Sequence, residues 1–166
     1  MTSLPSCIYQ VKIDRTRSFG EALHSTRRAV FAEPEVVSAV LPCKYSEVEI
    51  VLFNNPDLAD RHNEDGYDMD DGKCFMSNDE LAAQYVSRGL EPIHPIALAA
   101  IEECHPIFKQ VKAYSTHWKD AKGRWCYARF HLNMGGPWGE VDSREQYWTN
   151  EDIFVGVRIP RLPADK

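Results

Sequence analysis

Residues 115–132, STHWKDAKGRWCYARFHL, consist of two alternating segments around a turn, and this stretch decides the fold that the sequence predicts. In its DAKG segment, aspartate comes first and glycine fourth, which is typical of a type I turn followed by a glycine bulge. The turn predicts a β-hairpin with strands at 115–119 and 124–132. In that register Asp120 lies opposite Arg124.

The two faces of this hairpin differ in chemistry, because side chains alternate between the faces of a strand. One face is apolar and is expected to line the core: Thr116, Trp118, Cys126, Ala128, Phe130 and Leu132. The other, which we call the aromatic–basic face, carries Lys119 and the candidate binding residues His117, Trp125, Tyr127, Arg129 and His131. This face either stacks on a partner or ligand, or is covered by Trp138 and Trp148 from the 133–150 segment.

Patterns elsewhere in the chain predict further helices and strands. Capping boxes at Ser18–Glu21 and Ser77–Glu80 each mark the start of a helix. Helices are expected at 19–31, 33–41, 78–88 and 95–104, strands at 7–13, 46–53 and 152–159, and a glycine-rich loop at 133–147. The chain of 166 residues is expected to form a single domain, 1–166. Its predicted class is α+β: a mostly antiparallel sheet of about four to five strands with helices packed on one face.

The formal net charge of −6 is concentrated in one segment. Nine acidic and two basic residues occur between Asp57 and Glu80, whereas the rest of the chain is nearly neutral. The polar, aperiodic residues 54–73 predict a long acidic loop, which is either simply solvated or contacts a basic partner. The candidate partner contacts in this loop are Asp65, Asp68, Asp70 and Asp71. An acidic chain is not expected to bind nucleic acid directly, since phosphates require lysine and arginine.

No complete catalytic or cofactor motif occurs in the sequence, so we expect no cofactor and no metal. Both possible EF-hand registers of the acidic loop fail, and an irregular Mg²⁺ or Ca²⁺ site at Asp68, Asp70 and Asp71 is the alternative. The five cysteines are scattered without a C-x-x-C pair. They are interpreted as reduced, mostly buried thiols of a cytoplasmic protein, with Cys104 in the core. The longest apolar run is too short for a membrane span.

The segment THWKDAKGRWCYARF, 116–130, resembles uncharacterised small proteins carried on bacterial plasmids and integrative elements. The resemblance covers the last third of the chain, and it implies an accessory role such as blocking a defence system or neutralising a toxin.

The acidic charge favours a non-catalytic interaction protein that binds a basic surface on another protein, for example an inhibitor of the immunity or anti-defence type. Two alternatives use the aromatic–basic face instead. One is a small enzyme with a pocket on that face, and the other is a single-stranded nucleic-acid binder.

Overall fold

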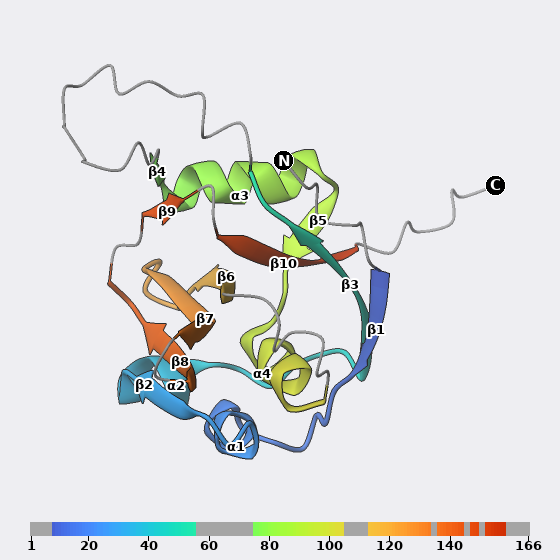
Figure 1. Cartoon of the computed structure of the whole chain (residues 1–166), viewed down its shortest axis with the longest axis vertical. Coiled ribbons are helices and arrows are strands. Elements are labelled where there is room, and N and C mark those ends of the chain that lie inside the picture. Colours follow the sequence, from blue (N-terminus) through green and yellow to red (C-terminus); the bar gives the residue numbers. More distant parts are fainter. Residues whose placement is uncertain are drawn as a thin grey trace.

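The computed structural model of the chain contains a mixed sheet of eight strands among the residues it describes (Figure 1). The described residues are 8–55, 75–104, 113–133, 136–144, 147–149 and 152–158. The strand order is β1, β3, β10, β6, β7, β8, β2, and β5 also pairs with β10. The strands are β1 (Ile8–Lys12), β2 (Ala29–Ala32), β3 (Glu47–Phe53), β5 (Leu90–Pro92), β6 (Ala113–Lys119), β7 (Trp125–Asn133), β8 (Gly136–Asp142) and β10 (Ile153–Arg158). A separate pair joins β4 (Phe75–Met76) to β9 (Trp148–Thr149).

This sheet corrects the predicted fold, because it is larger than four to five strands and its pairing is mixed. β10 pairs in parallel with β6, and β2 pairs in parallel with β8. The prediction missed β2, which overlaps the end of the expected helix 19–31, and β8, which falls inside the expected glycine-rich loop. β2 is held by parallel pairing with β8, more than 100 residues further along the chain, which local patterns do not reveal. β8 also pairs antiparallel with the preceding strand β7, but its two glycines and its proline favour a loop over a strand in local patterns.

Helices lie on both faces of the sheet, which is a second correction to the predicted fold. The described helices are α1 (Phe19–Ser25), α2 (Pro34–Ala39), α3 (Asn78–Ser87) and α4 (Pro95–Cys104). α1, α2 and α4 bury apolar side chains in one cluster with Ile50, Phe130 and Val155 of the sheet. α3 packs into a second cluster with Phe53, Tyr127, Trp148 and Phe154. Neighbouring residues such as Phe154 and Val155 belong to different clusters, so the clusters lie on opposite faces.

Local signals place the helices where the sequence predicts them to begin. Both predicted capping boxes form, with the Ser18 and Ser77 hydroxyls accepting from the amides of Glu21 and Glu80. α3 is followed by Gly89 at φ +66°, the left-handed conformation that favours glycine. The first turn of α3 contacts the aromatic–basic face of the hairpin, since Asn78 Oδ1 lies 3.0 Å from His117 Nδ1 and Asp79 accepts from the Trp125 indole at 3.2 Å.

The hairpin forms in the predicted register, with His117 opposite Tyr127 and Lys119 opposite Trp125. Its tip closes with the Asp120 amide donating to the Arg124 carbonyl oxygen at 3.0 Å. The predicted apolar face is largely buried in the first cluster, although Leu132 at its end is exposed. The role of the opposite, aromatic–basic face depends on which residues cover it.

Candidate functional site

The inner half of the aromatic–basic face, His117 and Trp125, lies against α3, with His117 buried and Trp125 partly exposed. His117 has no exposed surface, and its ring is stacked on both Tyr85 of α3 and Trp125. The centroid distances are 5.6 Å to Tyr85 and 4.4 Å to Trp125. The Lys119 ammonium lies 4.8 Å from the centroid of the Trp125 ring, so this ring is also engaged within the chain.

Asn78, the first residue of α3, joins this half of the face to β9. Its Oδ1 accepts from Trp148 Nε1 at 3.0 Å and lies 3.0 Å from His117 Nδ1. The Trp148 indole can only donate, so Oδ1 is the acceptor in that bond and is available to the His117 N–H as well. Burial lowers the pKa of His117 to about 4. His117 is therefore neutral at physiological pH and has the properties of a structural histidine.

The outer half of the face is a partly exposed polar network on β7 and β8. The Tyr127 hydroxyl donates to Glu140 at 2.8 Å, and the Arg144 guanidinium donates to the same carboxylate at 3.0 Å. His131 Nε2 lies 3.9 Å from Glu140. The adjacent His131 ring, together with the Tyr127 hydroxyl, lowers the pKa of Glu140 below its ordinary value. Glu140 is thus ionised at neutral pH, which does not suit a general acid.

Arg129 ties the outer half to β6 and β10. Its Nε donates to the Ser115 hydroxyl at 3.2 Å, and its Nη2 lies 3.4 Å from the Asp152 carboxylate. The guanidinium also lies over the Trp148 ring, 4.8 Å from its centroid. With 12% of its side chain exposed, Arg129 offers little surface to a partner.

Three buried nitrogen atoms on this half lack a hydrogen-bond partner: Arg129 Nη2, His131 Nε2 and Trp138 Nε1. The first has only the ion pair to Asp152, whereas His131 and Trp138 are stacked on each other at 4.2 Å. Three pockets of the described residues, one beside β3 and β5, one beside α1 and α4 and one beside Arg28 and Glu102, are lined by other residues. The network links β7 to β8 through Tyr127 and Glu140, and to β6 through Arg129 and Ser115.

The structure brings together all five candidate residues of the aromatic–basic face but leaves little of them accessible. Trp138 and Trp148 both cover this face, as the second interpretation of the sequence expected. The other candidate residues, Asp65, Asp68, Asp70 and Asp71, lie outside the described residues, as does most of the 54–73 loop. Cys104 is exposed at the end of α4 rather than buried, which corrects the expectation that it lies in the core.

The buried position of Arg129 changes what its removal should do. Arg129→Ala is expected to lower the free energy of unfolding by about 1–3 kcal/mol, because Asp152 would keep a largely buried charge without its partner. An exposed Arg129 would cost less than about 1 kcal/mol. Urea denaturation measures the difference, with Arg158→Ala as the control because the Arg158–Glu49 pair is exposed. Equal, small losses in both variants would contradict the burial of Arg129.

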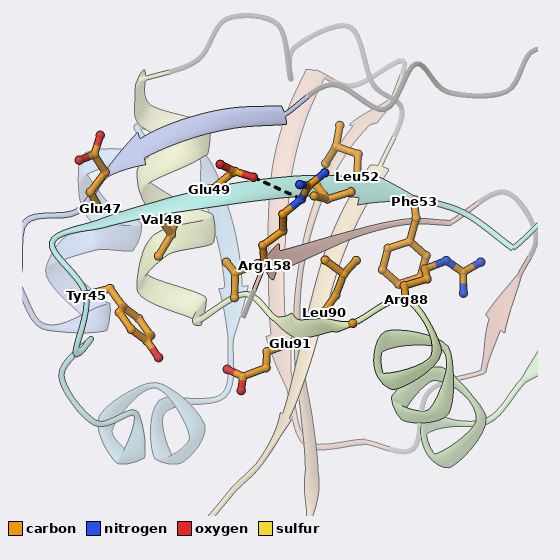
Figure 2. A pocket seen from close by; sticks show the side chains of 13 residues that line it. Tyr45, Glu47, Val48, Glu49, Leu52, Phe53, Arg88, Leu90, Glu91 and Arg158 are labelled. Carbon is orange, nitrogen blue, oxygen red and sulfur yellow. Dashed lines mark ion pairs between the residues drawn. The ribbon is translucent and has the colours of Figure 1, made fainter. Parts of the chain in front are cut away.

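The described part of the chain has an open groove of about 1070 Å³ between β3 and β5 (Figure 2). It lies where β10 ends at Arg158. Apolar side chains from the strands line it: Val48, Val51, Leu52, Phe53, Leu90 and Val157. Charged side chains and one tyrosine surround these: Tyr45, Glu47, Glu49, Arg88, Glu91 and Arg158. The groove thus combines an apolar lining with ionised groups at its margins.

The two ends of this groove differ in charge. Glu47, Glu91 and Tyr45 lie toward one end, while Arg88 lies against Phe53 at the other (Figure 2). The Arg88 guanidinium is 4.6 Å from the centroid of the Phe53 ring. Glu49 is paired with Arg158 at 3.2 Å, but neither Glu47 nor Glu91 forms an ion pair among the described residues.

Sequence reasoning missed this groove, although β3 holds a signal for it. Every second residue of β3 lies on the same face of the strand: Glu47, Glu49, Val51 and Phe53. This face is charged at the start of the strand and apolar at its end. Such a change marks the place where a buried face reaches the surface. The opposite wall, from Arg88 to Glu91, comes from a distant segment, and no local pattern predicts that it lies beside β3.

Comparison with known proteins found no matching family model, no matching curated protein and no matching solved structure. The resemblance of residues 116–130 to mobile-element proteins therefore stays a prediction. The described residues contain no cluster of three or more histidine, cysteine or carboxylate side chains arranged to hold a metal ion. They also contain no helix long and apolar enough to cross a membrane.

Proposed function

We propose that this protein is a non-catalytic interaction protein whose groove between β3 and β5 binds a basic, extended segment of a partner protein. The observation that carries the proposal is the pair of unneutralised carboxylates, Glu47 and Glu91, beside an apolar lining. A lysine or arginine of the partner would contact these carboxylates, and its apolar residues would contact the strands. Mixed recognition of this kind is typical of protein interfaces, where charge gives specificity and apolar burial gives affinity.

The net charge of the chain adds to this proposal. A formal charge of −6 attracts a basic partner over distances near the Debye length and thereby accelerates the encounter. Most of that charge lies in the 54–73 segment, whose Asp65, Asp68, Asp70 and Asp71 would contribute to this attraction. Binding should accordingly weaken as salt is added. An inhibitor of a nuclease or of a nucleic-acid-binding complex is the kind of protein that fits this description.

The two alternative functions receive less support from the geometry. An enzyme using the aromatic–basic face needs a cavity and a group that titrates near neutrality, whereas His117 and Tyr127 are buried and Glu140 stays ionised. A nucleic-acid binder needs aromatic faces that are free to stack on bases. Trp125 and His131 are instead stacked on rings of their own chain.

The proposal can be tested with a fluorescein-labelled peptide of alternating lysine and leucine, in which successive side chains suit the carboxylates and the apolar lining. Binding is followed by fluorescence anisotropy. The double variant Glu47→Gln, Glu91→Gln is expected to bind this peptide about two- to thirtyfold more weakly, since each exposed ion pair contributes roughly 0.2–1 kcal/mol.

Glu103→Gln provides the matched control, because it makes the same chemical change on α4, where Glu103 pairs with Arg17 away from the groove. It should leave the affinity unchanged. A peptide of alternating glutamate and leucine should bind far more weakly than the lysine peptide. If Glu103→Gln weakens binding as much as the double variant does, attraction to net charge explains the result and the groove is not the site.

A further inference from the structure

The edge strand β2 is the last strand of the sheet and pairs only with β8 among the described residues. Its four residues, Ala29–Ala32, are all apolar, and the Phe31 side chain is 68% exposed. Natural edge strands are usually protected from further pairing by charges, prolines or bulges. None of these features occurs between Ala29 and Ala32, so the strand resembles half of an interface.

The backbone groups available on β2 follow from its pairing with β8. The Glu33 amide donates to the Val141 carbonyl oxygen at 2.9 Å. Because backbone groups alternate in direction along a strand, Ala29 and Phe31 also point toward β8. The N–H and C=O groups of Val30 and Ala32 therefore point away from the sheet, and no described residue bonds to them across that edge.

We propose that two copies of the chain pair antiparallel through β2, with a two-fold axis at Phe31. In this register Val30 of each copy lies opposite Ala32 of the other, so every outward-facing N–H and C=O group of the two strands is used. Shifting one strand along the other in either direction would leave fewer backbone hydrogen bonds between the two copies. One alternative requires the Arg28 amide, which already donates to Thr26, and the other requires the N–H that Pro34 lacks.

The aromatic side chains support the same register. Phe31 packs edge-on against Trp138, with the ring centroids 5.8 Å apart and the planes at 79°. At the axis the two Phe31 residues occupy a non-hydrogen-bonded position, where opposite side chains are closest. Pairing therefore produces a continuous row of four rings, Trp138 and Phe31 from each copy, and removes the exposed phenylalanine from water.

The charges at the two ends of β2 are complementary in an antiparallel pair. Arg27 precedes the strand and Glu35 follows it, and both are exposed. Neither forms an ion pair among the described residues. Antiparallel pairing brings the Arg27 end of one copy to the Glu35 end of the other, twice by symmetry. A single strand pair buries little area, so the dimer should be weak and depend on concentration.

Sedimentation equilibrium from about 1 µM to about 1 mM tests the association directly. The wild-type chain should shift from monomer to dimer across this range. Phe31→Lys should weaken the dimer about tenfold or more, because it places like charges opposite each other at the axis. The control Val86→Lys changes another exposed apolar residue, on α3, and should associate like the wild type. A wild-type chain that remains monomeric, or equal weakening by both variants, overturns the proposal.

The register is tested by exchanging charges. Arg27→Glu alone should weaken the dimer, whereas adding Glu35→Arg in the same chain should restore it, because both end contacts are then reversed together. A double variant no tighter than Arg27→Glu would rule out this register.

A cross-link provides a second test of the axis. With Cys7, Cys74 and Cys104 changed to serine, Phe31→Cys should form an intermolecular disulfide on mild oxidation, since the two thiols would face each other at the axis. Val86→Cys in the same background should not. Equal cross-linking at both positions would show random collision and overturn the proposed axis.

Discussion

Trp148→Ala is expected to lower the free energy of unfolding by about 3–5 kcal/mol, the range for removing a large buried ring. The Trp148 side chain has no exposed surface, and it contacts Tyr127, Phe154 and Arg129. Its loss would also deprive Asn78 of a donor. Chemical denaturation measures this change, and Phe130→Ala on the opposite face of the hairpin should cost a similar amount because that ring is also buried.

The control for this prediction is Val86→Ala, which truncates an apolar side chain that is 77% exposed on α3. It should change stability by less than about 0.5 kcal/mol. If Trp148→Ala costs as little as Val86→Ala while Phe130→Ala remains costly, the aromatic–basic face is not a core wall. It would then be available to a ligand.

The stability of the protein should fall as the pH falls from about 6.5 to about 4, owing to His117. Its pKa is lowered from 6.5 to about 4 in the folded state because the ring is buried. As the pH decreases, the unfolded chain binds a proton on this ring before the folded chain does, which favours unfolding. The contribution is about 3 kcal/mol over the window, and about 2 kcal/mol of it is lost by pH 5.

His117→Phe separates this effect from other titrating groups, because phenylalanine keeps the stacked ring but binds no proton. Urea denaturation of both proteins at pH 7 and pH 5 should give a smaller loss for the variant, by about 2 kcal/mol. NMR titration of the His117 ring should give a midpoint well below 6. A midpoint at or above 6.5 would show that the ring is solvated, contrary to its burial under α3.

The parts of the fold that local chemistry specifies could be predicted from the sequence. The DAKG turn gives the hairpin register, and the serine–glutamate boxes give the starts of α1 and α3. β2 and β8 could not be predicted in this way. α1 ends early because the Thr26 hydroxyl bonds to the Leu23 carbonyl oxygen and Arg27 turns the chain at φ +56°. β8 is a strand despite its glycines, and at Gly139 a Cβ would lie 2.9 Å from the Phe130 ring.

The candidate site shows the same division between local and distant contacts. The alternation of the hairpin correctly groups His117, Trp125, Tyr127, Arg129 and His131 on one face. Whether that face meets water or α3 depends on Tyr85 and Asn78, which are separated from the hairpin by more than a helix in the sequence. Buried and exposed aromatic–basic faces have the same pattern of residues, so the pattern alone left both interpretations open.

The most direct test of the account is an NMR titration of the ¹⁵N-labelled protein with the lysine–leucine peptide. The backbone amide signals of residues 47–49 and 88–91 should shift on binding, because these residues line the groove. The indole N–H signals of Trp125 and Trp148 should stay in place, since both donate to partners within the chain. Shifts of the two indole signals with unchanged groove amides would contradict binding in the groove and would show that the peptide binds at the hairpin instead.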